Sequence, residues 1–284
     1  MRHIKNWRII AFILLTLMVC LAVYPILFLL TGSLKNSGEL SQDLGPIFNN
    51  REGFAKWSMF PENPTLRSYV ELLIDSPSFF VMFWNSIKIV VLVLGGHLLV
   101  GVPAAWGFAH FGFKGKKILF MIYVALMLLP FQVLMLSEYL TINALHLMNT
   151  HWAIILPGIF STFPVFIMYN FFRKIPKEIV EAARLDGCGE IRIFWNIGIP
   201  LGAPGIIAML VLGFLEYWNL IEQPLIFLND QPLWPLSLYL PNISLEKAGV
   251  DFVAAVITLL PSILIFLLGQ DQMEQGIVAS TKKE

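Results

Sequence analysis

The residues of this sequence best suited to act at a protein surface lie in one polar segment. It reads Glu-Ala-Ala-Arg-Leu-Asp-Gly over 181–187 and is followed by Ile-Gly-Ile-Pro over 197–200. Pro176 before it and Gly187 at its end predict a helix of about ten residues, roughly 15 Å long, because proline suits a first helical position and glycine suits the left-handed conformation that ends helices. A short helix with alanines among its charges can enter a groove of another protein. The alternative is a solvated loop whose charges only fix topology.

The rest of the chain is too apolar for a soluble domain. Of its 284 residues 57% are hydrophobic and 13% are charged, against about 25% charged in soluble domains. The mean hydropathy of +0.73 favours an all-α protein that crosses a membrane several times. A net charge of zero argues against nucleic acid as a partner. The two cysteines, Cys20 and Cys188, lie far apart without a cluster of metal ligands, so no disulfide, metal site or cofactor is predicted.

Six stretches are long and apolar enough to span a bilayer, which takes about 20 residues of helix. They are about 9–30, 84–109, 118–137, 152–172, 201–221 and 252–269. The first is longer than the apolar core of a signal peptide, so we expect it to be an uncleaved span. Prolines within the second, third and fourth spans predict kinks or local breaks: Pro103, Pro130, Pro157 and Pro164. We expect one transmembrane domain over 1–284.

The distribution of lysine and arginine predicts the orientation of these spans. Basic residues gather in the N-terminal tail, in the 110–117 turn and in the 173–200 loop, whereas 138–151 has none and 222–251 has only Lys247. The positive-inside rule then places both termini and the 173–200 loop in the cytoplasm. The long 31–83 segment is expected to be an extracytoplasmic loop, with a short amphipathic helix that begins near Thr65 and runs through Leu72.

The polar segment resembles the hallmark of a known family, the inner-membrane permease subunits of binding-protein-dependent ABC importers, in the maltose-type carbohydrate branch. That hallmark, the EAA motif, is Glu-Ala-Ala, three residues, Gly, nine residues and Ile-x-Leu-Pro. Here Glu181, Gly187 and Pro200 stand at those spacings, and the departure is Ile199 in place of leucine. Further similarities cover nearly the whole chain, among them Asn85-Ser86, Phe113-Lys114-Gly115 and Trp218-Asn219.

The resemblance implies the type I permease fold of ABC importers and a transport subunit that is not itself an enzyme. The implied machine has a second permease, two ATP-binding subunits and an extracytoplasmic solute-binding protein, and sits in a prokaryotic inner or plasma membrane. It would import a sugar or sugar-like solute. Its coupling helix would dock into an ATPase subunit, and the docking residues carried over by the motif are Glu181, Ala182, Ala183, Asp186, Gly187, Ile197 and Pro200.

Polar residues near the outer ends of two spans are candidates for the pathway lining, because sugars are bound by hydrogen bonds and aromatic faces. They are Gln132, Glu138, Glu216, Trp218 and Asn219; hydrogen bonding between helices is the alternative for each. His97 lies well inside a span and is expected to be a packed core histidine. The 222–251 loop is expected either to contact the binding protein or pathway, or to be a packed connector.

Two other classes of protein fit the residues less well. An ion-coupled secondary transporter needs ionisable residues near the middle of the bilayer and usually has an internal repeat, and no repeat is seen. An integral membrane enzyme would need a histidine box, a nucleophile motif or paired carboxylates at one depth, and none is present.

Overall fold

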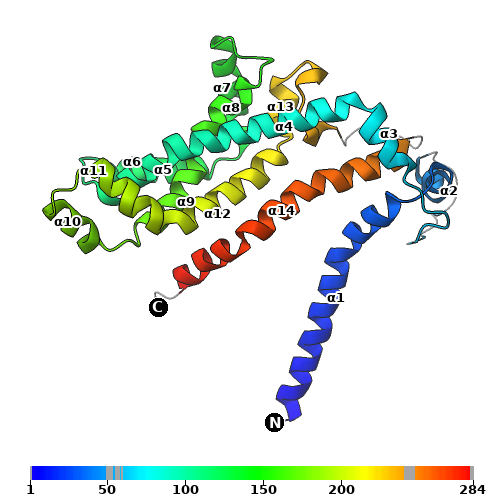
Figure 1. The fold of residues 1–284 in the computed structure, drawn as a ribbon, viewed down its shortest axis with the longest axis horizontal. Coiled ribbons are helices and arrows are strands. Elements are labelled where there is room, and N and C mark those ends of the chain that lie inside the picture. The colour runs from blue at the N-terminus through cyan, green and yellow to red at the C-terminus, as the bar shows by residue number, and fades with distance from the viewer. Residues whose placement is uncertain (1, 49–53, 55–57, 59, 240–246, 282–284) are drawn as a thin grey trace. The chain divides into compact units, whose positions relative to one another are not determined.

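The structure is a computed structural model that describes residues 2–48, 54, 58, 60–239 and 247–281, and every regular element in these ranges is helical (Figure 1). The α-helices are α1 Arg2–Gly32, α2 Ser37–Phe48, α3 Arg67–Asp75, α4 Pro77–Gly96, α5 Val102–His110, α6 Lys116–Met127, α7 Phe131–Ala144, α8 Trp152–Ile159, α9 Thr162–Phe172, α10 Lys177–Leu185, α11 Glu190–Ile193, α12 Ile199–Trp218, α13 Glu222–Phe227 and α14 Ala248–Thr281. The remaining elements are the π-helices η1 His97–Gly101 and η2 Phe194–Gly198 and the 3-10 helices η3 Gln231–Leu233 and η4 Leu236–Leu238. The chain forms two compact units, one of Met1–Phe79 with Leu240–Leu260 and one of Phe80–Tyr239 with Pro261–Glu284.

Five helical stretches within the described residues are long and apolar enough to cross a membrane. They are Ile10–Gly32, Pro77–His110, Trp152–Phe172, Glu190–Trp218 and Ala248–Asp271. A sixth is obtained if α6 and α7 are counted as one bent span. The prediction of a helical protein that crosses a membrane several times is therefore confirmed, and the predicted number of six is reached when the bent pair is counted as one span.

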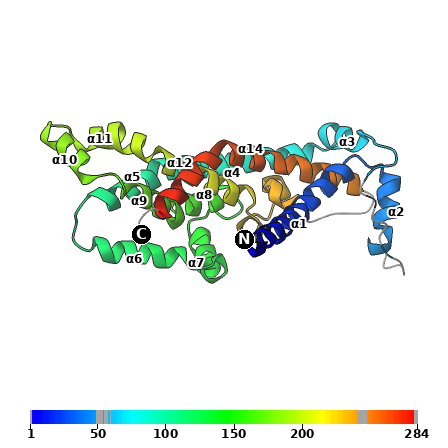
Figure 2. The same ribbon diagram turned by 90° about the horizontal axis from the view of Figure 1, so that it is seen from below.

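The kink or local break predicted at Pro130, within the 118–137 span, is confirmed. The chain ends α6 at Met127, restarts at Phe131, and turns by 103° between the two helices. Figure 2 shows this change of direction between α6 and α7. Pro130 is the physical cause, because it lacks a backbone N–H and disfavours the helical conformation in the residue before it.

Two other spans contain a π turn directly before a proline. In η1 the N–H of Val102 donates to the carbonyl of His97, and Pro103 follows. In η2 the N–H of Ile199 donates to the carbonyl of Phe194, and Pro200 follows. In both spans the wider turn lies next to a proline, which has no N–H to donate. Each helix therefore continues past its proline.

The helix that contains the fifth predicted span, 201–221, begins earlier in the chain, at Glu190. The 173–200 loop therefore consists of α10, a short link and the first turns of this long helix. In the 31–83 segment the predicted amphipathic helix is present as α3, and α2 and the first turns of α4 were not predicted.

In the first unit the end of α1 packs against the start of α14. Phe28 contacts Phe252 edge-on with ring centroids 5.6 Å apart, and a side chain on Gly32 would meet the same ring. The hydroxyls of Ser33 and Tyr69 lie 2.8 Å apart and connect the end of α1 to α3.

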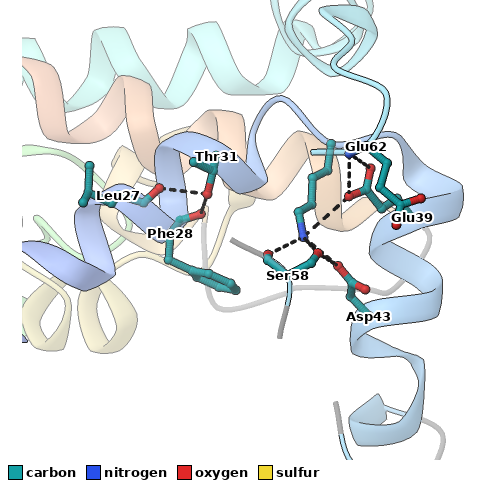
Figure 3. A network of polar contacts seen from close by, with 8 residues as sticks. Leu27, Phe28, Thr31, Glu39, Asp43, Ser58 and Glu62 are labelled. Atoms are coloured by element: carbon teal, nitrogen blue, oxygen red, sulfur yellow. Dashed lines mark hydrogen bonds and ion pairs between the residues drawn. The ribbon is translucent and has the colours of Figure 1, made fainter. Parts of the chain in front are cut away.

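A buried ion pair fixes α2 to the end of α1 (Figure 3). The ammonium of Lys35, which is 2% exposed, donates to Oδ2 of Asp43 at 2.6 Å and to the carbonyl of Ser58 at 2.8 Å. The hydroxyl of Ser58 donates to the same carboxylate at 2.9 Å. Buried charges are tolerated only when they are paired and hydrogen-bonded, and this pair meets both conditions.

The core of the second unit is built where α5, α9 and α12 meet, and Figure 1 shows α9 and α12 side by side. Three glycines allow this close approach. A Cβ on Gly198 would come within 2.9 Å of the Trp106 ring, one on Gly205 within 2.5 Å of Phe171, and one on Gly202 would overlap Phe172. Small residues at such spacings let membrane helices approach closely and gain dispersion energy.

The described part of the 222–251 loop is joined by hydrogen bonds to α4 and to the residue that precedes α8. Asn85 donates to the carbonyls of Pro232 and Trp234 at 2.7 and 3.0 Å, and the hydroxyl of Ser86 accepts the N–H of Leu236 at 2.8 Å. His151 lies 3.0 Å from the carbonyl of Leu233, and burial lowers the pKa of its imidazole. Residues 240–246 of the loop lie outside the described residues.

We expect Lys35→Met to loosen α2, because the carboxylate of Asp43 would stay buried without its cation. Breaking a buried pair from one side costs about 3 kcal/mol or more, so amide hydrogen exchange across 37–48 should be roughly 100-fold faster. The double variant Lys35→Met with Asp43→Leu removes both charges and is the control. Equal exchange rates in the single and double variants would contradict the role given to the pair.

We expect Gly202→Ala to lower the thermal stability of the purified protein, because the new methyl group overlaps the fully buried ring of Phe172. Overpacking of this kind costs about 1–3 kcal/mol. Adding Phe172→Leu should restore part of the loss. The matched control is Gly189→Ala, where a Cβ meets nothing within 4 Å, and an equal loss there would refute the packing argument.

Candidate functional site

The polar segment forms α10, a helix with defined ends. Its N-cap is Pro176, and Glu178 lies in its first turn, where the positive end of the helix dipole favours a carboxylate. At the other end Gly187 has φ +79°, its N–H donates to the carbonyl of Arg184 at 3.0 Å, and the N–H of Cys188 donates to that of Ala183 at 3.0 Å. These two bonds form a Schellman motif. The predicted helix and its glycine stop are confirmed.

One side of α10 is anchored in the core of the second unit. Val180 is 1% exposed and belongs to the same cluster as Ile193, Phe172 and Trp106, and Ala183 packs against that cluster. The buried face therefore runs through Val180, whereas the neighbouring Ile179 is 43% exposed. The spacing of three residues between Val180 and Ala183 is the signal that would have identified it.

The opposite side of α10 is open. Glu181, Ala182 and Asp186 are exposed, and Leu185 is 89% exposed. An apolar side chain left so far in solvent beside small and acidic neighbours is a surface with the composition of a contact site.

An ion pair joins α10 to the helix that follows it. Arg184 donates to both oxygens of Glu190, from Nε at 2.6 Å and from Nη2 at 3.1 Å. This hydrogen bonding raises the pKa of Arg184 above its ordinary value. The salt bridge found in this part of the described chain is therefore the one between Arg184 and Glu190.

The seven docking candidates fall into two groups. Five lie on α10 or at its end: Glu181, Ala182, Ala183, Asp186 and Gly187. Ile197, in contrast, is half-buried against the core cluster, and Pro200 lies in the first turn of α12. The second half of the motif thus packs within the unit through Ile197, Gly198 and Ile199, with Gly198 against Trp106, whereas Pro200 is exposed.

Trp106 is the residue on which these elements converge. Its ring lies edge-on to Phe172 at 5.3 Å, close to Phe194 at 5.8 Å and against His110 at 4.0 Å between centroids. The second ring nitrogen of that histidine, Nε2, is 3.1 Å from the carbonyl of Phe172. Because Phe194 is in η2 and Phe172 ends α9, this tryptophan connects the base of α10 to two spans.

Two of the five pathway candidates line one cavity of about 340 Å³ under the bend between α6 and α7. They are Glu138 of α7 and Glu216 of α12, and the wall also includes Tyr217, Gln223 and Ser161. One carboxylate oxygen of Glu138 and the amide oxygen of Gln223 have no hydrogen-bond partner within the described residues. The cavity therefore presents free acceptors, which suits a ligand that carries hydroxyl or amine donors.

The other three candidates lie elsewhere. Gln132 donates to Glu222 at 2.6 Å, Trp218 is buried between Phe83 and Phe214, and the amide of Asn219 donates to a carbonyl of its own helix at 2.8 Å. His97 is a packed core histidine as expected, 1% exposed and 2.8 Å from the carbonyl of Gly158.

Tyr217, Gln223 and Ser161 were missed as cavity residues. Ser161 lies at the break between α8 and α9 within the Trp152–Phe172 span, Gln223 lies in the short helix α13, and Tyr217 lies between the candidates Glu216 and Trp218. Glu216 and Tyr217 are adjacent on one helix, and nothing in the sequence indicates that both side chains line the same cavity.

Comparison with known proteins agrees with this architecture. Residues 98–278 match the family described as the inner membrane component of binding-protein-dependent transport systems. The arabinooligosaccharides transport system permease protein AraQ of Bacillus subtilis (strain 168) is 30% identical over 98% of this chain and 96% of its own length. The lactose transport system permease protein LacG of Rhizobium radiobacter is 27% identical over 96% of each.

A solved structure shares the fold. One chain of the crystal structure of a bacterial ABC transporter involved in the import of the acidic polysaccharide alginate superimposes with a TM-score of 0.83, over 95% of this chain and 98% of that one, at 21% identity. The match of more than half of the sequence, with the helical spans and the motif at α10, is sufficient for assignment. The chain belongs to the family of binding-protein-dependent transport system inner membrane components.

Proposed function

We propose that this chain forms half of the translocation pathway of an ATP-driven importer for a sugar or sugar-like solute. Relatives that align over almost the whole chain are permeases for arabinooligosaccharides and lactose, which supports a carbohydrate as the cargo. A second permease completes the pathway, an extracytoplasmic binding protein delivers the solute, and separate subunits hydrolyse ATP. The family assignment gives no support to the alternative of an ion-coupled secondary transporter.

The observation that carries this proposal is the exposed face of α10. A helix whose Glu181, Ala182 and Leu185 face solvent, and whose end is fixed by a Schellman motif, is suited to enter a groove on an ATPase subunit. The small side chain of Ala182 on this face lets such a groove approach the helix backbone closely. The mode of recognition is a preformed helix in a cleft, so little conformational entropy is lost on binding.

Movement of a docked α10 would pass into the membrane through two connections. Val180 holds the helix to the core cluster around Trp106, and the pair of Arg184 with Glu190 ties it to the start of the long helix that contains α12. Because interiors are packed as densely as crystals, a displacement of α10 moves its packing partners rather than compressing them. Domain closure in the ATPase pair would thereby rock the permease between its two open states.

The orientation of the chain follows the distribution of basic residues. With α10 on the cytoplasmic side, both termini are cytoplasmic and the 31–83 segment is extracytoplasmic. The acceptor-rich cavity around Glu138 and Glu216 is then part of the pathway, and sugar hydroxyls are the donors that would satisfy its free oxygens.

We expect Gly187→Pro to separate the ATPase subunits from the permease. Proline cannot adopt the positive φ of this position, so the end of α10 must rearrange. Co-purification of the ATPase subunits and solute uptake in reconstituted vesicles are the measurements, with Gly189→Ala as control. Glu181→Lys should have the same effect with a milder backbone change. Normal association and normal uptake in both variants would refute the docking role.

We expect Glu138→Gln and Glu216→Gln to slow solute uptake by about tenfold or more each. A hydrogen bond from a solute hydroxyl to a carboxylate is worth about 1.5–3 kcal/mol, and an amide accepts less strongly. Basal ATP hydrolysis should change little, since neither residue lies on α10 or in the core cluster that supports it. Glu71→Gln on the exposed face of α3 is the matched control. Uptake at the wild-type rate in the double variant would exclude a role in the pathway.

A further inference from the structure

A second pocket lies at the turn between α5 and α6 and shares no lining residue with the cavity around Glu138 and Glu216. Its volume is about 650 Å³. Three aromatic rings, two lysines and a turn glycine line it: Phe113, Phe120, Tyr169, Lys116, Lys117 and Gly115. A site with an aromatic wall and a cationic rim has the composition of a receptor for an amphiphilic anion.

The aromatic wall is rigid before any ligand arrives. Phe120 and Tyr169 lie with ring centroids 4.1 Å apart, and Phe108 of α5, 7% exposed, supports Phe120 at 5.6 Å and Phe113 at 6.0 Å. Gly115 has φ +82° and starts α6 from a left-handed turn, which brings the lysines that follow it directly to the pocket.

The cations around this pocket lack carboxylate partners. Lys116 donates to the carbonyl of Phe111 at 2.9 Å, and the charges of Lys177 and Arg173 lie close enough to repel its ammonium. Within the described residues no salt bridge is made by the basic residues of this region: Lys114, Lys116, Lys117, Arg173, Lys174 and Lys177. Like charges held together without counter-ions raise the energy of the folded protein, and a bound anion would lower it.

The position of the cluster points to a ligand that comes from the membrane. The apolar part of α6 begins at Ile118, directly after Lys117, and α9 ends at Phe172, directly before Arg173. These helices pack on each other, so the cations lie at one common end of two spans. Beyond them α6 presents an apolar surface, with Ile118 64% and Met121 61% exposed.

We propose that this pocket binds the headgroup of an anionic phospholipid from the leaflet on the side of α10. Lys116 and Lys117 would contact the phosphate, the aromatic wall would hold the glycerol and the first acyl carbons, and the chains would lie along α6. Basic pockets between membrane helices on the cytoplasmic side are suited to such headgroups. An acidic surface of a partner subunit is the competing occupant, but it would leave the exposed apolar surface of α6 unused.

Occupation of the pocket has a consequence for the docking helix. Arg173 and Lys177 flank the connection that leads from α9 into α10, so an anion that attracts both would steady the start of α10. The lipid would then act on coupling as well as on stability. This makes the membrane composition a regulator of the importer.

The test is lipid retention by the purified protein, together with whatever subunits accompany it, using dioleoyl phosphatidylglycerol and dioleoyl phosphatidylcholine as probes and native mass spectrometry as the readout. The wild type should retain phosphatidylglycerol in preference. Lys117→Gln should weaken retention about fivefold, which is the loss expected for one lysine at a charged membrane surface. The double variant Lys116→Gln with Lys117→Gln should weaken it about 25-fold, because the two losses multiply. Lys247→Gln, with the same change of charge elsewhere, should retain the lipid.

Each other outcome would overturn the proposal. Equal retention by Lys117→Gln, Lys247→Gln and wild type would show that the pocket is not the site, and equal retention of both lipids would show that charge is not recognised. Displacement of the lipid by millimolar inorganic phosphate would assign the pocket to a free anion. Loss of ATPase association in Lys117→Gln with unchanged lipid retention would assign it to a partner subunit. Since the readout is lipid retention, none of these results depends on transport.

Discussion

The close contact of α12 with α9 and α5 is the interaction on which the rest of the second unit depends. Gly198 and Gly202 leave room for the rings of Trp106 and Phe172, and those rings in turn support the buried side of α10 through Val180. Without a hydrophobic force between helices in lipid, such packing must come from contact at short range. The exposed face of α10 and the helices of the membrane core thus belong to one packed unit, so a force applied to that face is transmitted to the spans.

The EAA motif divides into two parts with different physical roles. Its first part, Glu181 to Gly187, forms the exposed end of a helix that a glycine terminates, and its second part packs within the unit through Ile197 to Ile199. The nine residues between them contain Glu190, the partner of Arg184. The spacing of the motif therefore corresponds to the length of chain between the exposed face of α10 and the packed interface that supports α10.

Much of the fold could be predicted because its signals are local. The apolar runs, the prolines and the stop at Gly187 report on their own neighbourhoods, and the helix over 177–185 and the break at Pro130 followed from them. The angle between the two helices at that break could not be predicted, because a missing N–H does not determine the direction in which the chain continues. Lys35 was missed because a lysine is ordinarily solvated, and its burial depends on Asp43 and Ser58. The cavity was found in part, because Glu138 and Glu216 are costly in a span, whereas Tyr217 and Gln223 join them only through the tertiary fold.

The wide turn of η2 decides which side of α12 meets its neighbours. One additional residue in a turn shifts the azimuth of everything downstream by about 100°, the rotation of a single residue in an α-helix. Without it, Gly202 and Gly205 would point about a quarter-circle away from Phe172 and Phe171. The direction in which Gly202 and Gly205 point around the helix axis therefore depends on this one wide turn. The same arrangement of wide turn, glycine and proline in η1 sets the direction in which Trp106 points.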